Sequence, residues 1–160
     1  GTLAFAFIIA GQGPRAFGMP EMFAPSQHLR RHGVVEKNSI MLTDGRYSGV
    51  TKGACVGHMV PEVFEGGGIG TLMSGDLLWM RLDQRRIDLI DREAFLSGRL
   101  EAVPGAPFHE RQALLESRQA AIEARQRQIA ACNILDNVSS AEYGVVPLSV
   151  HRRATIPWSF

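Results

Sequence analysis

Cysteine and tryptophan are scarce in this chain of 160 residues, with two of each, and neither sign of charge predominates. The cysteines, Cys55 and Cys132, lie far apart, and neither has a second Cys or His at the spacing of a zinc site. We therefore expect two free thiols in a reducing, cytoplasmic compartment, and a single disulfide between them is the alternative. The formal net charge of +1 gives no reason to expect a nucleic acid or an anionic membrane as a partner.

Long hydrophobic runs are also missing. The apolar stretch TLAFAFIIA, residues 2–10, is too short to cross a bilayer and is typical of a strand buried on both faces. A chain of this length is enough for one domain with a core. Because the strand starts with no lead-in, we expect the chain to be a fragment of a longer protein.

Several further elements follow from apolar patterns and from glycine or proline at their ends. We expect a second buried strand at 39–43, strands at 69–73, 76–82 and 85–90, a helix over 21–32 that Gly33 ends, and a short helix over 91–100 with Asp91 as its N-cap. The longest helical pattern covers 108–135. Its apolar positions Phe108, Leu115, Ile122 and Ile129 recur every seven residues, so this helix should lie on a surface or contact a neighbouring subunit.

The loop GPRAFGMPEM, residues 13–22, combines a rigid backbone with a carboxylate at its exit, Glu21. Carboxylates are ligands that hard divalent cations prefer, so Glu21 is a candidate metal ligand. The alternative is an acid in the first turn of a helix, where the helix dipole favours negative charge. Composition alone favours this alternative.

The loop TDGRYSGVTKG, residues 43–53, follows the second predicted buried strand and holds Ser48 and Thr51. It is not a nucleophile elbow, because Arg46 stands where that motif has its first glycine. The residues alone favour a turn in which Asp44 and Ser48 bond their own backbone. A reactive serine needs an activating partner, and the loop itself supplies none.

Four motifs in order, GPRAFGMPEM, LTDGRYSG, GHMVPEVFEGG and GDLLWMRLDQRRIDL, resemble the C-terminal domain of the dihydroxy-acid dehydratase and phosphogluconate dehydratase family. The resemblance covers roughly residues 5 to 100. It implies a mixed α/β fold, a β-barrel-like swivelling β/β/α domain with flanking helices and a long C-terminal helix. We assign 1–103 to the partial domain, and 104–160 to the long helix and docking tail of the same domain.

The resemblance also implies a reaction. Members of this family remove water from a 2,3-dihydroxy acid to give a 2-keto acid, with an iron–sulfur cluster as Lewis acid and Mg²⁺ holding the substrate. The family's magnesium-binding glutamate maps onto Glu21, and its proposed serine base maps onto Ser48. Thr51 is close enough in sequence to orient Ser48. The cluster ligands belong to the family's N-terminal domain, so this chain alone should hold no cluster and should be inactive.

Two departures shape the expected substrate and partners. Ala16 and Phe17 stand where many members have two glycines, and the long tail differs from the biosynthetic pattern. We therefore expect a sugar-acid dehydratase that acts together with its N-terminal domain as a homo-oligomer. The alternatives are a branched-chain dihydroxy-acid dehydratase and a non-catalytic binding or assembly module that keeps the fold.

Overall fold

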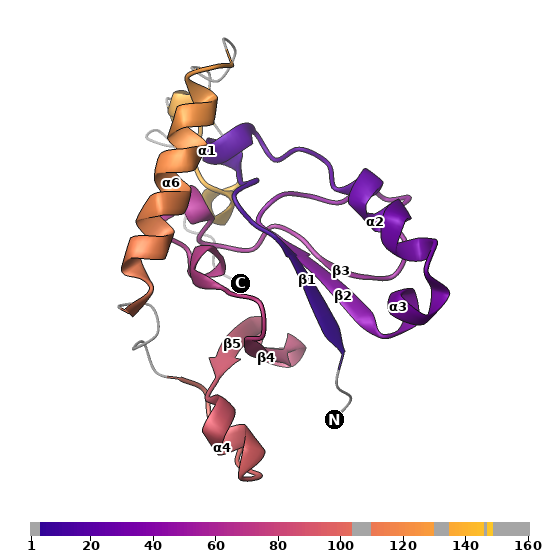
Figure 1. Cartoon of the computed structure of the whole chain (residues 1–160). Coiled ribbons are helices and arrows are strands. Elements are labelled where there is room, and N and C mark those ends of the chain that lie inside the picture. The colour runs from indigo at the N-terminus through magenta and orange to yellow at the C-terminus, as the bar shows by residue number, and fades with distance from the viewer. Residues whose placement is uncertain (1–3, 104–109, 130–134, 146, 149–160) are drawn as a thin grey trace.

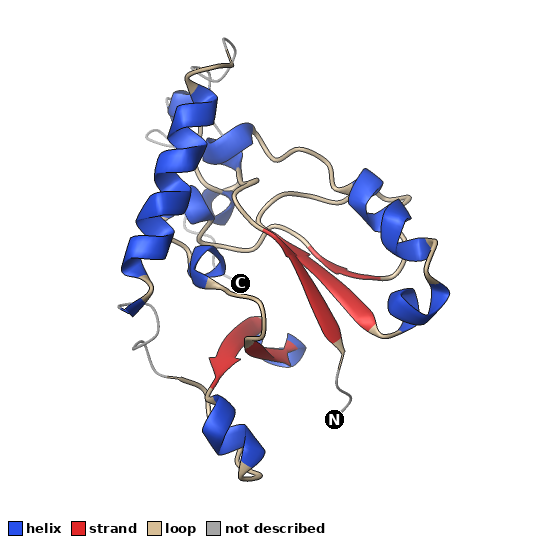
Figure 2. Cartoon of the chain, viewed as in Figure 1, coloured by secondary structure: helices blue, strands red, loops and turns tan. Residues whose placement is uncertain are grey.

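A computed structural model describes residues 4–103, 110–129, 135–145 and 147–148. Its strands form two small sheets (Figures 1 and 2). The first is parallel, in the order β1 (Phe5–Ile9), β2 (Ser39–Thr43) and β3 (Ala54–Val56). The second is an antiparallel hairpin of β4 (Leu77–Arg81) and β5 (Arg86–Ile90). The mixed α/β class is confirmed.

The described strands close no barrel, so the barrel-like expectation is not supported. The sheets have three and two strands and remain separate, and far more strands are typical of a closed barrel. The helices have the following bounds: α1 (Pro14–Phe17), α2 (Phe23–Arg30), α3 (Gly33–Lys37), α4 (Arg92–Leu96) and α6 (Gln112–Gln126). Short 3-10 turns add η1 (Val63–Glu65), η2 (Gly68–Thr71), η3 (Leu82–Gln84) and η5 (Ala141–Tyr143).

The parallel sheet has its most buried strand at its centre. β2 pairs with β1 on one side and β3 on the other, and most of its side chains are buried. β1 lies at the edge of this sheet, and Phe5 is 71% exposed. The prediction that residues 2–10 are buried on both faces is therefore wrong for the first half of β1.

Local patterns predicted some elements correctly and missed others. The hairpin is confirmed, as is the N-cap of α4, where the Asp91 carboxylate accepts from the Ala94 N–H at 2.7 Å. Gly33 does not end the helical region but begins α3. The predicted strand over 69–73 is wrong, because its first residues form η2, with the Gly70 N–H donating to the Gly67 carbonyl.

The main core lies between α1, η1, η2 and α6. Its buried residues are Ala16, Val63, Ile69, Leu115 and Ile122. Leu115 and Ile122 are the two central members of the predicted heptad set, so the apolar stripe of α6 packs within its own chain. Figure 1 shows α6 running beside α1. The helix covers only the middle of the predicted range 108–135, part of which lies outside the described residues, as does most of the predicted docking tail.

A salt bridge fastens the start of α6 to the segment before the hairpin. Arg111 donates to both oxygens of Asp76, with N–O distances of 2.6 and 2.9 Å, and also to the Thr71 carbonyl at 3.1 Å. Burial acts to raise the pKa of Asp76, but the hydrogen bonds from Arg111 and from the Met73 N–H outweigh burial and lower the pKa. The pair is mostly buried, so its geometry is well fixed.

We expect Asp76→Asn to lower the free energy of unfolding of the full-length protein by about 1–3 kcal/mol at neutral pH. The folded-state pKa is depressed, so the stabilisation is present above the unfolded value near 4 and is lost as the pH falls through the folded value. Urea unfolding at several pH values should show parent and variant converging in acid. Glu101→Gln, which breaks the exposed pair with Arg99, is the control and should change stability little. Equal loss at all pH values would contradict the assignment.

Candidate functional site

The two loops singled out from the sequence meet at one edge of the parallel sheet. β1 and β2 are parallel neighbours whose last residues, Ile9 and Thr43, are paired. The loops that leave these strands therefore start side by side (Figure 1). The carboxyl ends of parallel strands are the usual place for a site in α/β folds.

Asp44 ties the loops together at their base. Its side chain is fully buried and accepts hydrogen bonds from three backbone N–H groups: Gly11 at 3.0 Å, Gln12 at 2.8 Å and Val63 at 3.1 Å. These partners lie 19 to 33 residues away in sequence. The prediction that Asp44 bonds its own turn is wrong, because the carboxylate is used to join three segments.

Glu21 and Ser48 are brought into direct contact further along the loops. Glu21 and Arg46 form a parallel β-bridge, in which the Met22 N–H donates to the Arg46 carbonyl at 2.9 Å. Arg46 Nε donates to the Met19 carbonyl at 2.7 Å. The Ser48 N–H then donates to Glu21 Oε1 at 2.9 Å. The candidate metal ligand thus lies beside the candidate base, although 27 residues separate them.

Three side-chain hydroxyls of this loop have no partner among the described residues. Ser48 Oγ, Thr51 Oγ1 and the Tyr47 hydroxyl are buried, and none of them makes a hydrogen bond to any residue that the structure describes. A buried polar group without a partner is costly in a stable fold, and such groups mark places where a ligand or another segment supplies the partner. Burial, and secondarily Cys55, raises the pKa of Tyr47, so its phenol stays protonated. Ser48 does not form the turn bond expected from the sequence.

The residues at this site fit Mg²⁺ in part. Glu21 offers a carboxylate, and the unpartnered hydroxyls of Ser48 and Thr51 are neutral oxygens, which are the donors a hard cation takes. The described residues contain no group of three or more His, Cys, Asp or Glu side chains that could hold a metal ion. Glu21 can therefore contribute one ligand to a site that needs further oxygens.

The same residues do not fit an iron–sulfur cluster. Such clusters are held by several cysteine thiolates. Cys55 is the one cysteine in the described part of the chain, and burial raises the pKa of its thiol, which disfavours the thiolate. Cys132 lies outside the described residues.

Glu62 is a site residue that sequence reasoning missed. Its side chain is 1% exposed, and its two oxygens accept from the N–H groups of Arg15 at 2.9 Å and Ala16 at 3.1 Å. Burial raises the pKa of Glu62, the two N–H groups oppose that rise, and the charges of Glu65 and Asp44 add to it. The one signal in the sequence is an acid inside the largely apolar run HMVPEVF, which could equally be an exposed helical turn.

Gly13 leaves the space that Glu62 fills. A Cβ at Gly13 would lie 2.0 Å from Glu62 Oε2 and 2.5 Å from Glu62 Cβ, closer than atoms can approach. The φ of Gly13 is −66°, which any residue adopts. The glycine is needed here for space and not for its conformation.

We expect Gly13→Ala to lower the free energy of unfolding by about 2–5 kcal/mol, because it displaces a buried carboxylate and leaves two N–H groups unpaired. Thermal unfolding of the full-length protein measures this. Gly33→Ala is the control, since nothing lies within 4 Å of its added methyl group. A loss for Gly13→Ala no larger than that for Gly33→Ala would show that Glu62 can move without cost.

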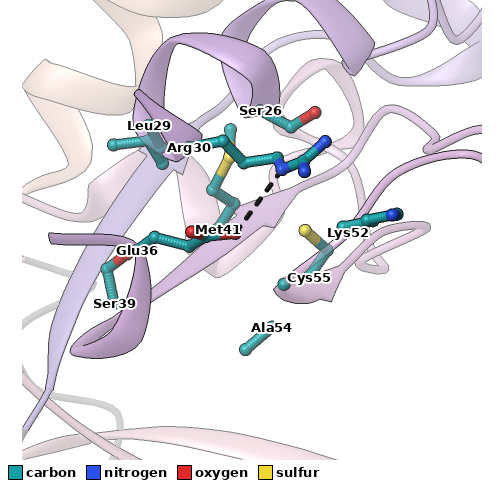
Figure 3. Close-up of a pocket in the computed structure, with 10 residues that line it drawn as sticks. Ser26, Leu29, Arg30, Glu36, Ser39, Met41, Lys52, Ala54 and Cys55 are labelled. Atoms are coloured by element: carbon teal, nitrogen blue, oxygen red, sulfur yellow. Dashed lines mark ion pairs between the residues drawn. The ribbon is translucent and has the colours of Figure 1, made fainter. Parts of the chain in front are cut away.

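A separate hollow of about 240 Å³, counting its open mouth, lies between α2, α3, β2 and β3 (Figure 3). Arg30 and Glu36 in its wall pair with each other, with Arg30 Nε 3.5 Å from Glu36 Oε1. Cys55 also lines it. Glu21, Ser48 and Thr51 do not, so the hollow is not part of the site predicted from the sequence.

The fold and the site together define a mixed α/β domain with an oxygen-donor site at the carboxyl edge of a parallel sheet. The chain belongs to the dihydroxy-acid/6-phosphogluconate dehydratase family, whose C-terminal domain model matches residues 5–144. The dihydroxy-acid dehydratase of Methanoregula boonei is 43% identical over 98 residues, which are 61% of this chain and 18% of that protein.

Two further relatives are similar. The mitochondrial dihydroxy-acid dehydratase of Saccharomyces cerevisiae is 41% identical over 101 residues, which are 62% of this chain and 17% of that protein. The dihydroxy-acid dehydratase of Clostridium novyi is 41% identical over 95 residues, which are 59% of this chain and 17% of that protein. The matched part therefore spans less than a fifth of the length of these relatives. No helix in the described part of the chain is long and apolar enough to cross a membrane.

Proposed function

We propose that this chain is the C-terminal part of a hydro-lyase that removes water from a 2,3-dihydroxy acid and yields a 2-keto acid. The observation that carries the proposal is the contact between Glu21 and Ser48, in which the serine N–H is bonded and its buried Oγ has no partner among the described residues. The family and the names of the relatives support the reaction class.

A branched-chain dihydroxy acid is the better supported substrate. The relatives described above are all named dihydroxy-acid dehydratases, and none is named for a sugar acid. The sugar-acid expectation relied in part on Ala16 and Phe17 lining the metal loop. Ala16 is instead fully buried in the main core, and the ring of Phe17 lies under the Arg125 guanidinium, 5.5 Å from its centroid. These two residues give no reason to expect a changed substrate pocket.

The residues of this chain would act as follows. Ser48 Oγ takes the proton from C2, the electrons of that C–H bond form the C2–C3 double bond, and the C3 hydroxyl leaves as water after gaining a proton. The resulting enol tautomerises to the keto acid. Thr51 orients the serine: its N–H donates to the Ser48 carbonyl at 3.1 Å. Mg²⁺ held in part by Glu21 would stabilise negative charge that develops on the substrate and favour ionised Ser48.

The remaining ligands and the iron–sulfur cluster would belong to other parts of the whole protein, foremost an N-terminal domain. The described residues do not fit a cluster, so none of them is assigned to holding it. The alternative of a non-catalytic assembly module relied on α6 as an interface. The buried residues of α6, Leu115 and Ile122, pack against η1, η2 and α1, which weakens that argument. A homo-oligomer in the cytoplasm remains a prediction.

The test is an assay of the full-length protein, prepared anaerobically with Mg²⁺, on branched-chain 2,3-dihydroxy acids and on a panel of aldonic acids. We expect keto-acid formation from the branched-chain substrates. Turnover of aldonic acids alone would restore the sugar-acid alternative. No keto acid from either set, with metal and cluster shown to be present, would overturn the proposed reaction.

A further inference from the structure

We infer that Glu62 and Gln126 are positioning residues that hold α1 from its two ends and thereby fix Glu21 against Ser48. The inference rests on the proposed function, in which Glu21 and Ser48 are the metal ligand and the base. Gln126 belongs to α6, so this helix is connected to the site, a role that the sequence did not indicate.

Glu62 holds the start of α1. The first N–H groups of any helix have no partner within the helix. In α1 the N-cap residue is Gly13, which has no side chain to satisfy them. Glu62 satisfies two of them from 46 and 47 residues away, one with each carboxylate oxygen. Its negative charge also lies where the helix dipole favours it.

Gln126 holds the end of α1. The last carbonyls of a helix also lack partners within it. Gln126 Nε2 donates to the carbonyls of Arg15 at 2.7 Å and Ala16 at 2.6 Å. The peptide units of Arg15 and Ala16 therefore have their N–H groups bonded to one remote side chain and their carbonyls to another. The two middle residues of this four-residue helix are thus held from outside on both sides.

The path from this clamp to Glu21 is short and stiff. Gly18 and Met19 both adopt the left-handed conformation, with φ of 72° and 55°, and Met19 is a residue that rarely does so. The Met19 carbonyl is held by Arg46 Nε, and the φ of Pro20 is fixed by its ring. A shift of α1 is therefore passed on to Glu21 and is not absorbed by free rotation in between.

The main test compares Gln126→Ala with Arg118→Ala in the full-length protein. Arg118 is a matched control on the same helix, because it also donates to two carbonyls, those of Gly70 at 2.7 Å and Leu72 at 3.0 Å, but these belong to η2 and its end. Both variants should lower the Tm. We expect only Gln126→Ala to weaken binding of Mn²⁺, the probe used, by about 10-fold, and to raise KM more than it lowers kcat.

Glu62→Gln is the stronger variant, since its amide can accept from only one of the two N–H groups and opposes the other with a donor. We expect a 10- to 100-fold loss of Mn²⁺ affinity. Hydrogen exchange of the amides of residues 15–22 is the readout independent of activity. It should quicken in Glu62→Gln and Gln126→Ala and stay unchanged in Arg118→Ala.

If Gln126→Ala leaves both the exchange of residues 15–22 and the Mn²⁺ affinity at the values of Arg118→Ala, the positioning role is overturned. The comparison of Gln126→Ala with Arg118→Ala remains decisive even if Glu62→Gln does not fold. Gln126 is only half-buried, and replacing it removes no buried charge. Failure of the proposed function looks different. The parent protein would then form no keto acid, while the exchange readout would still report on the clamp.

Discussion

Replacing Ser48 by alanine is expected to lower kcat of the full-length protein by about 10²- to 10⁴-fold while leaving its Tm and KM close to those of the parent. The effect on the rate follows from the proposed role of Ser48 as the base that takes the C2 proton. The small effect on stability follows from the structure, because Ser48 Oγ bonds no described residue and the Ser48 N–H that donates to Glu21 remains in the variant. Keto-acid formation under saturating substrate, together with thermal unfolding, measures both.

Ser26→Ala is the matched control for this experiment. Ser26 is also buried, at 2% exposure, but its Oγ donates to the Phe23 carbonyl at 2.6 Å. Its loss should lower the Tm and leave kcat unchanged. Thr51→Val should reduce kcat less than Ser48→Ala, since valine keeps the backbone N–H that donates to the Ser48 carbonyl. Turnover by Ser48→Ala at the parent rate would show that the base is another group.

The parts of the fold that were predictable depend on contacts between residues near in sequence. The hairpin from 77 to 90 and the Asp91 N-cap belong to this class, because a turn and a cap are settled within a few residues. β3 was missed because its three residues, ACV, have too little pattern of their own and become a strand only by pairing with β2. The edge position of β1, and hence the exposure of Phe5, depends in the same way on which strands pair.

The candidate site, too, could be predicted from the sequence only in part. The resemblance singled out Glu21 and Ser48, but no local rule places one against the other, since the contact depends on the bridge between Glu21 and Arg46. The sequence did not show that Asp44 and Glu62 join distant segments, because their partners are backbone N–H groups far away in the chain. A backbone amide carries no signature in the sequence. Long-range acceptors of this kind are found only when the fold is known.

The hydrogen bonds at the site show which side chains hold the loops in place and which remain available to a ligand. The carboxylates of Asp44 and Glu62 are fully used on backbone N–H groups, so neither is available to a metal without loss of structure. Glu21 uses one oxygen on Ser48, and the hydroxyls of Ser48 and Thr51 are unused within the described residues. Among Glu21, Asp44 and Glu62, Glu21 is therefore the one free to act as a ligand.

This reasoning gives the second large expected effect. We expect Glu21→Gln to weaken the binding of Mg²⁺ or Mn²⁺ by about 100-fold or more, because a direct ligand should matter at least as much as the residues that support it. Glutamine has almost the same shape, and its carbonyl oxygen can still accept from the Ser48 N–H. The variant therefore removes the negative charge while it keeps the contact that joins the two loops.

Titration of the full-length variant with Mn²⁺, followed by its spin resonance signal, measures the affinity, and the Tm without metal should equal that of the parent. Raising Mg²⁺ should restore part of the activity, which distinguishes a lost ligand from a lost base. Glu65→Gln is the matched control. Glu65 lies in η1 and pairs with Arg15 at 3.2 Å, and it does not accept from the Ser48 N–H. Parent affinity in Glu21→Gln, or an equal loss in Glu65→Gln, would remove Glu21 from the metal site and leave the 2.9 Å contact with Ser48 as a purely structural bond.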